Sequence, residues 1–333
     1  MTYGIVSARK IQLGLEDSSA GSNTAATAIW RGPGAQIDDG LTIVSPNENV
    51  GLYTDTDRTY IPFKMATLDF PETAATYEQM LYLLSAGVKN VTTGTSDGTG
   101  TGEIFSYPVS SSAPNTTSTY TIEAGDNIVA AYMAYSFPLS FELTWAPKQA
   151  LMVSSKWVGR QKVAQAFTAL TLTNFPVEEI LAPTIYIDST SVGDTQLAGT
   201  LIGYKLTYNT GLFPLATGDG ELYFHTVVMK KPSCVLSLTY EHDTALATEY
   251  AAYVAQTTRL VRIKHIGSAL TVGSGLYANK TFKIDLAGRY TAFPPFTDQD
   301  GDNIVTAEIT AGWNAAASLF VTFTDVCTLA SVQ

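Results

Sequence analysis

Apolar and polar residues alternate with a period of two along much of the chain, a pattern typical of β-strands with one buried face. Residues 64–70 and 234–240 are two such segments, 170 residues apart. The apolar residues that share a face in them are Ala66, Leu68 and Phe70 in the first segment and Leu236, Leu238 and Tyr240 in the second. The pattern predicts a mostly-β chain (α+β).

Each of these two strands is followed by apolar residues at helical spacing, which predicts one amphipathic helix after each strand. Thr73 and Asp243 stand before the helices and are the predicted N-caps, and Gly87 is predicted at the C′ position, just after the first helix. The spaced apolar residues are Tyr77, Met80, Leu81 and Leu84 in the first helix and Leu246, Tyr250, Tyr253 and Val254 in the second.

One string occurs twice: Gly-Asp-Asn-Ile-Val at 125–129 returns letter for letter at 301–305, 176 residues later. Alternating apolar positions follow both copies, so each is predicted to be a polar turn that leads into a half-buried strand, and the two turns are predicted to be the same corner of two modules. Since the strand–helix units repeat at nearly the same offset, we interpret the chain as an internal duplication. The predicted modules are 1–162 and 163–333. The alternative is two unrelated β domains with similar turns.

Other segments fit this plan. Ile11, Leu13 and Leu15 alternate, which predicts an N-terminal arm or first strand. Residues 37–62 are polar and rich in turn formers, which favours a long hairpin or a mobile loop. Further alternating strands are predicted at 104–109, 129–137, 139–145, 152–157, 170–172, 185–187, 201–208, 221–228, 260–264 and 282–286.

Composition narrows the class of protein. The net charge is −11, and both halves are mildly acidic, with 10 basic and 15 acidic residues in 1–165 and 9 and 15 in 166–333. This balance lacks the basic footprint of a nucleic-acid binder. Neither a signal peptide nor a transmembrane run is predicted, so the expected place of synthesis is the cytoplasm. Cys234 and Cys327 form no metal-binding spacing, and Cys234 is predicted to be a buried free thiol.

Candidate chemistry is sparse. The three histidines, His225, His242 and His265, are far apart in sequence, which favours surface or satisfied core residues over a metal site or a catalytic triad. No nucleophile elbow, zincin or Walker A motif is present. The Gly-rich run 98–102 opens no predicted helix, so a flexible loop is expected there instead of a phosphate site.

Two acidic segments are candidate sites. Residues 298–303 resemble the start of a calcium loop, but Asn303 and Ile309 stand where an EF-hand needs Gly and Glu, so a tight turn is expected. Glu178 and Glu179 are adjacent, so on a strand their side chains would diverge, and a solvated edge is expected.

One pair of basic residues fits two interpretations. Arg262 and Lys264 would share a strand face, and they are either an interface to an acidic neighbour or a solvated face. No catalytic, cofactor-binding or metal-binding residue is predicted, and no cofactor is expected.

Several separated strings resemble the tail tube (major tail) proteins of long-tailed bacteriophages. They are 153–161 (VSSKWVGRQ), 175–181 (FPVEEIL) and 283–288 (KIDLAG), together with the duplicated strand–helix units and the second copy of the repeated string. The resemblance is weakest in 1–50 and 92–119. It implies β-sandwich or barrel-like modules, each with one flanking helix, and a non-enzymatic virion protein. Two fused modules resemble the members that form rings of three chains with pseudo-sixfold symmetry.

The resemblance also implies partners. The protein would polymerise with itself into helically stacked rings, with the tape measure protein inside and the tail terminator and distal tail protein as further neighbours. Double-stranded DNA would pass through the lumen during ejection without specific binding, and no membrane is involved. An acidic lumen is expected, because it would repel phosphates. Residues 37–62 are expected to reach the next ring.

Three other readings compete. The chain is alternatively the inner-tube protein of a secretion system or contractile tail. The number of chains in each ring would distinguish this alternative from the tail tube of a long-tailed phage. It is alternatively a secreted or surface carbohydrate-binding or adhesin β protein with Tyr-rich loops. A β-sandwich glycosidase is the third reading, and the absence of a paired carboxylate motif argues against it.

Overall fold

The computed structural model describes residues 3–16, 20–54, 57–171, 177–271, 273–299 and 301–332, and over these residues the chain is mostly β with two helices. All pairings between its strands are antiparallel. The strands are β1 Lys10–Leu15, β2 Ala28–Ile29, β3 Ala66–Ala74, β4 Thr95–Ser96, β5 Glu103–Pro108, β6 Tyr120–Gly125, β7 Ala130–Trp145, β8 Met152–Gly159, β9 Val163–Ala164, β10 Pro183–Asp188, β11 Leu201–Asn209, β12 Leu212–Leu215, β13 Thr226–Met229, β14 Ser233–Glu241, β15 Arg259–Ala269, β16 Asn279–Ala292, β17 Thr297–Gln299, β18 Asp302–Ala311 and β19 Val321–Cys327. The helices are α1 Tyr77–Gly87 and α2 Thr244–Val254, after a 3₁₀ turn, η1, at Val6–Ala8.

One long strand, β7, holds two layers of the first half together. Its first part pairs with β6 and β9, and its second part pairs with β8 and β11. Tyr135 has a positive φ of 56° where the strand changes partners. The layer β7–β6–β1–β2 therefore faces the layer β3–β8–β7. The aromatic core between the layers stacks Phe70 on Trp157, with ring centroids 5.3 Å apart, and sets Tyr120 edge-on at 6.2 Å.

The same order of pairings occurs in the second half. In the first half β1 pairs with β6, β6 with β7, β7 with β8, and β8 with β3. In the second half β10 pairs with β15, β15 with β16, β16 with β18, and β18 with β14. The strand–helix units β3–α1 and β14–α2 also repeat, and each helix starts 167 residues from its counterpart (77 and 244). This repetition is what the predicted duplication requires, although the division into two modules stays a prediction.

The repeated string does not mark one corner, and the predicted equivalence of its two copies is wrong. Residues 126–129 form the loop between β6 and β7, whereas Gly301 lies in the turn from β17 into β18, the strand that takes the place of β8. Both copies do lead into strands with alternating burial. The turns differ because Asp126 accepts from the amides of Ile128 and Val129, both at 2.8 Å, while Gln299 pairs directly with Asp302 in a shorter hairpin.

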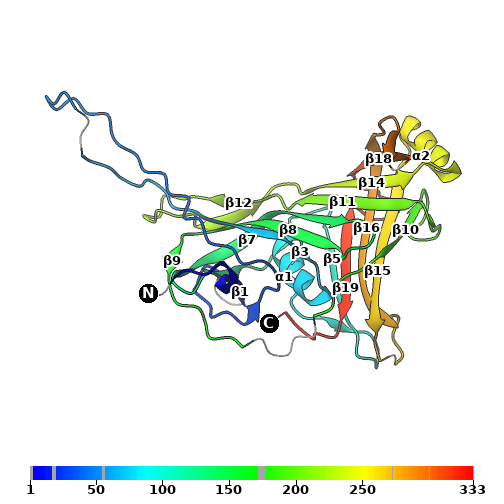
Figure 1. Cartoon of the computed structure of the whole chain (residues 1–333), viewed down its shortest axis with the longest axis horizontal. Helices are drawn as coiled ribbons and strands as arrows, with labels where there is room; N and C mark the ends of the chain where they lie inside the picture. The colour runs from blue at the N-terminus through cyan, green and yellow to red at the C-terminus, as the bar shows by residue number, and fades with distance from the viewer. Residues whose placement is uncertain are drawn as a thin grey trace.

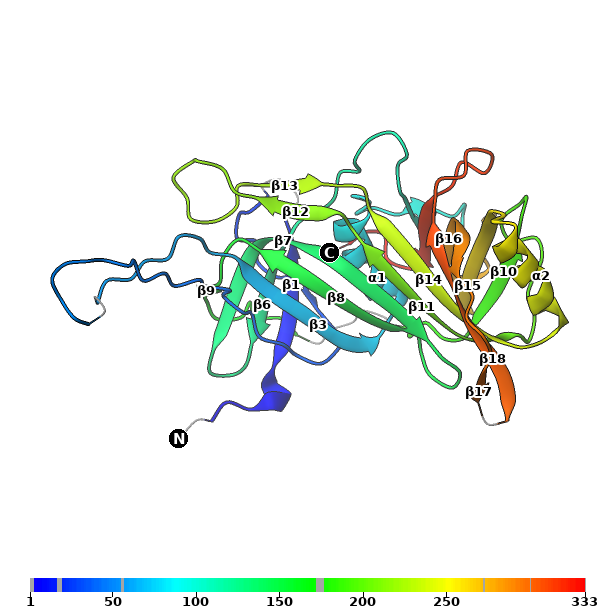
Figure 2. The same ribbon diagram turned by 90° about the horizontal axis from the view of Figure 1, so that it is seen from above.

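The two halves are joined edge to edge. β11 lies between β7 of the first half and β14 of the second, so β3, β8, β7, β11, β14 and β18 form one uninterrupted sheet surface (Figure 2). A second junction pairs β5 with β19. β9, which the predicted boundary at 162 places in the second module, pairs with β7 of the first half.

The local predictions have mixed outcomes. The amide of Leu246 donates to Asp243 at 3.1 Å, which confirms this residue as an N-cap. Thr73 is not a cap: it lies in β3, and Thr76 caps α1 by accepting from the amide of Gln79 at 3.2 Å. Gly87 is the last residue of α1 and not the residue after it.

Other segment predictions fared as follows. Strands predicted at 129–137 and 139–145 are one strand, β7. Of the strand predicted at 221–228, only the last part is a strand, as part of β13, which pairs with β12. Residues 170–171 form no strand, and 172 lies outside the described residues. The N-terminal strand is confirmed as β1, with Ile11 and Leu13 buried.

Residues 37–62 contain a long projecting hairpin whose arms meet at a bridge between Val44 and Tyr60 (Figure 1). It leaves the body at the end that holds η1, and α2 lies at the opposite end (Figure 1). Neither helix of the described chain is long and apolar enough to cross a bilayer.

Candidate assembly interface

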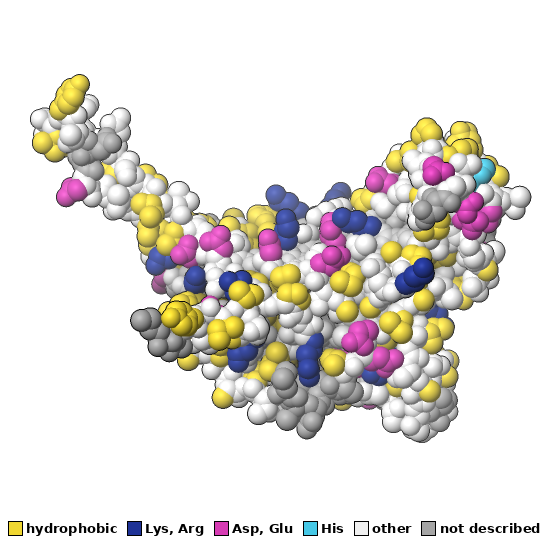
Figure 3. Space-filling view, viewed as in Figure 1, with side chains coloured by type: hydrophobic (Ala, Val, Ile, Leu, Met, Phe, Trp, Pro, Cys, Tyr) yellow, Lys and Arg dark blue, Asp and Glu magenta, His cyan; other side chains and the backbone are white. Residues whose placement is uncertain are grey.

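The six-stranded surface has a solvated outer face of hydroxyl and mixed charged side chains. Lys205 of β11 forms a 2.9 Å ion pair with Glu142 of β7, and Asp69 stands directly opposite Lys156 in the β3–β8 register. Thr239 and Thr306 hydrogen-bond across β14 and β18 at 3.0 Å. Acidic and basic side chains lie side by side along the edge of the molecule where this sheet runs (Figures 1 and 3). Because the lysines are matched by carboxylates, this face presents no basic track.

One edge of this sheet has little cover. β3 pairs with β8 on one side, and on the other side its only bridge among the described residues joins Thr67 to Asp38. Beyond the bridge, Asp69 and Glu72 expose charged side chains and Pro71 lacks an amide donor. These residue types protect edges from indiscriminate pairing, so the open edge is short and guarded.

The two halves also meet through a buried ion cluster. Lys280 of β16 lies 2.6 Å from Glu78 of α1 and 3.3 Å from Glu178. Glu178 additionally accepts from the amide of Ser268 at 2.6 Å. Burial raises the pKa of Glu178, but the bonds from Ser268 and Lys280 outweigh it and lower the pKa overall. The prediction of a solvated edge is therefore wrong for Glu178, which is a junction residue. Glu179 forms a bridge to Thr76.

Asp325 of β19 lies behind this cluster, fully buried, and neither of its carboxylate oxygens has a hydrogen-bond partner among the described residues. Burial and the charge of Glu78 raise the pKa of this carboxyl well above its ordinary value. The hydroxyl of Tyr77 on α1 is also buried, and no described residue hydrogen-bonds to it. These groups are enclosed between α1 and the second half, which makes the cluster a structural junction.

The three histidines do not converge. His265 is a satisfied core residue: its Nδ1 donates to the carbonyl of Leu181, and its Nε2 accepts from the hydroxyl of Tyr204 at 2.8 Å. His225 pairs with Asp219 at 2.9 Å near the β12–β13 hairpin, and the ring of His242 lies 4.1 Å from that of Phe296. Burial lowers the pKa of His265 to about 4.

We expect His265 to make the protein acid-sensitive. The folded pKa of about 4 lies below the ordinary 6.5, so stability from this residue is complete above pH 6.5 and is lost as pH falls toward 4. The loss should approach about 3 kcal/mol, since each pKa unit corresponds to about 1.4 kcal/mol. Urea denaturation of wild type and His265→Gln across this window measures it. The Gln variant should show the flatter profile, and parallel profiles would contradict the assignment.

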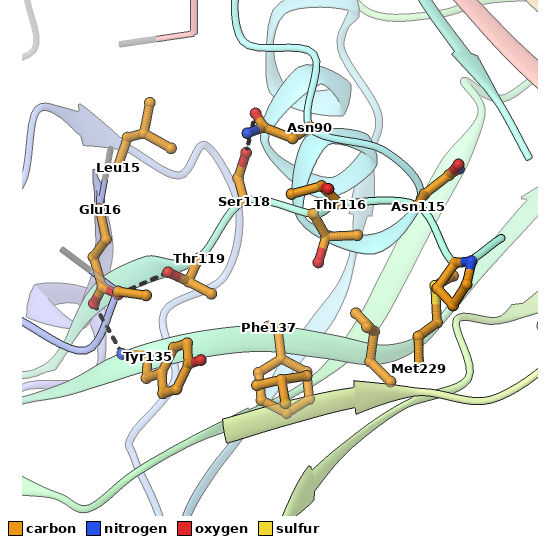
Figure 4. A pocket seen from close by; sticks show the side chains of 15 residues that line it. Leu15, Glu16, Asn90, Asn115, Thr116, Ser118, Thr119, Tyr135, Phe137 and Met229 are labelled. Atoms are coloured by element: carbon orange, nitrogen blue, oxygen red, sulfur yellow. Dashed lines mark hydrogen bonds between the residues drawn. The ribbon is translucent and has the colours of Figure 1, made fainter. Parts of the chain in front are cut away.

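A pocket of about 500 Å³ lies among β1, the segment before β6, and β7 (Figure 4). Its carboxylate, Glu16, accepts from the hydroxyls of Thr119 and Thr121 and from the amide of Tyr135, each at 2.8 Å. Ser118 donates to Asn90 at 2.9 Å on the far wall. Glu16 thus ties the segment before β6 to Tyr135 of β7, where that strand changes partners.

The remaining candidate segments have structural roles. Arg262 pairs with Asp285 across β15 and β16, with Nε 2.6 Å from Oδ1, so this basic residue is neutralised within the chain. Asp298 and Asn303 face each other in the β17–β18 hairpin, and Asp300 lies outside the described residues. No group of three metal-ligating side chains occurs among the residues described. Cys234 and Cys327 are buried free thiols, which confirms the prediction for Cys234.

Comparison of the chain with family models and with curated proteins gives no significant match. The residues that the sequence analysis missed are Lys280, Glu78 and Asp325. They come from β16, α1 and β19, and only the register of the folded sheet brings them together. The one sequence signal was the charged residues on otherwise apolar strands and on an apolar helix.

Proposed function

We propose that this protein is a structural subunit that assembles with copies of itself into closed, stacked rings, the tail tube of a long-tailed bacteriophage. The observation that carries the proposal is the six-stranded surface, which passes from one half of the chain to the other through β11 without a break. The string-level resemblance supports the same assignment. The protein would act in the virion, after assembly in the bacterial cytoplasm, and not as an enzyme.

The geometry favours ring closure by unlike surfaces. A ring forms when one face of each subunit contacts a different face of the next and the rotation closes. The open edge of β3 is at one side of the six-stranded surface, and β18 with the end of β16 is at the other. If each chain supplies two modules, three chains complete the pseudo-sixfold ring.

The outer face of the sheet suits a conduit. Threonine, serine and matched charges line it, so DNA phosphates meet no array of lysines and few counterions are released on contact. The mixed charges make this face less acidic than the overall charge of −11 implied. DNA slides along a surface when the surface attracts it only weakly, and we expect this face to attract DNA weakly. The tape measure, terminator and distal tail proteins remain the expected partners.

Electron microscopy of the purified protein tests the proposal. In negative stain at high protein concentration, we expect hollow tubes, and cryo-electron microscopy should show three chains in each ring. Strict monomers at every concentration would contradict the proposal, and rings of six chains would contradict the two-module assignment. Binding on a glycan array without tubes would favour the adhesin reading.

A further inference from the structure

Helix α2 carries an apolar stripe that faces solvent. Ala247, Tyr250, Ala251 and Val254 are spaced as one helical face, and all are exposed, with Tyr250 at 52% and Val254 at 65%. A groove of about 410 Å³ borders the first part of this face, where Ala247 and Tyr250 line it, and its other wall is the segment Phe293-Pro294-Pro295-Phe296. Hydrophobic side chains are visible at the α2 end in Figure 3. The sequence pattern predicts that Tyr250 and Val254 lie on the apolar face of an amphipathic helix, but neither side chain enters the core.

The matching stripe on α1 is fully covered. The residues 167 positions earlier are Met80, Leu83, Leu84 and Gly87, and all four are buried. α1 contacts β7 and β5 of its own half and, in addition, β16 and β19 of the second half. Thus the two helices have equivalent places in the pairing pattern and differ in their cover. α1 lies at the junction between the halves, and α2 lies at the free end (Figure 1).

We propose that the α2 stripe and its groove are the docking surface for a second copy of this chain, whose first half covers α2 as the second half covers α1. The inference rests on the proposed ring assembly and identifies its contact. A second copy is the occupant because the chain already contains one example of the interface.

The pairing pattern also places the complementary surface. β19 and β16 cover α1. The counterpart of β19 is β9, because β9 pairs with the first part of β7 as β19 pairs with the first part of β16, and the counterpart of β16 is β7. Ile128 and Val129, exposed at 50% and 55%, stand at the start of β7. The neighbouring Asn127 accepts from the amide of Ile5 at 3.0 Å, so this loop lies beside the segment that leads into η1. The contact is therefore head-to-tail, the kind that a ring requires. The Glu78–Lys280 pair has no charged counterpart here, since Ala245 is the residue 167 positions after Glu78.

A charge placed in the stripe tests the surface. Tyr250→Glu and Val254→Glu should raise the concentration for half-maximal assembly at least tenfold, measured by sedimentation velocity. Leu276→Glu is the matched control, since Leu276 is an 88% exposed apolar residue in the β15–β16 connection. It should assemble like wild type. Val254→Glu and Leu276→Glu should keep the wild-type thermal midpoint, whereas Tyr250→Glu also loses the ring contact with Phe293. Unchanged assembly of both α2 variants would overturn the proposal.

A cross-link identifies the partner surface. With Tyr250 replaced by p-benzoylphenylalanine, photo-activation should join it to residues 126–167 of another copy, as mapped by mass spectrometry. Links from α2 to α2, or links only within one chain, would overturn the head-to-tail contact. If the wild type forms rings and the α2 variants assemble equally well, this inference is rejected and the tube proposal stands. Paired chains with the expected cross-link but no rings would reject the tube and keep the interface.

Discussion

Lys280→Met is expected to lower the free energy of unfolding by about 3–5 kcal/mol, because removing one partner of a buried ion cluster leaves its charges unpaired. Lys280 is the cation between Glu78 and Glu178, and its side chain is almost fully buried. Asp325 lies close enough to have its pKa raised by Glu78, so the loss of the cation leaves several acidic groups together in the core. Urea denaturation followed by tryptophan fluorescence measures the change.

Lys205→Met is the matched control. It removes a lysine from a strand surface and breaks the ion pair with Glu142, but the two side chains are 50% and 41% exposed. Exposed pairs contribute about 0–1 kcal/mol, so this variant should unfold almost like wild type. Combining Lys280→Met with Glu78→Leu should recover part of the loss. Equal effects of Lys280→Met and Lys205→Met would show that the cluster does not stabilise the junction.

Local features were predictable from the sequence where one residue and its near neighbours decide the outcome. The alternation in 64–70 and 234–240 fixed which side chains are buried, and the Asp243 cap depends on an amide three residues away. The Thr73 prediction failed because β3 carries a register shift between Phe70 and Thr73 that continues the strand. The sequence offers no direct sign of such a shift.

Long-range features were out of reach. The repeated string has the same letters in both halves, but hairpin length and strand partners decide its place, and these follow from register. Glu178 was read as solvated because its partners, Ser268 and Lys280, lie about ninety and a hundred residues away. Likewise, the apolar residues of the exposed α2 stripe have the same spacing as those of a stripe buried in the core. The two differ only because no other half covers α2 in the described chain.

The two long strands explain why the halves depend on each other. β7 and β16 each belong to two layers, so each half bends one strand around its own core. β11 uses the outer edge of β7 for pairing, and β5 uses the outer edge of β19. A break in either junction exposes strand edges in both halves. The junction therefore protects edges within the chain, and we expect contacts between chains to protect the rest.

Removing residues 40–58, with a short Gly-Ser linker in their place, is expected to leave rings intact and abolish their stacking into tubes. The hairpin projects beyond the body and makes few contacts with it, so its loss should not change the thermal midpoint (Figure 1). Its exposed apolar side chains, Ile43, Val50, Leu52 and Tyr53, gain nothing in the isolated chain and become stabilising when buried in a neighbouring ring.

Negative-stain microscopy with sedimentation velocity measures the outcome. We expect single rings and a tube yield at least tenfold lower than wild type at the same protein concentration. Tyr53→Ser, which removes one side chain from the hairpin, should lower the yield less than the deletion does. Tubes of wild-type length from the deletion variant would show that the hairpin does not join rings. Loss of the rings themselves would place the hairpin at the contact within a ring, where α2 and β7 are expected instead.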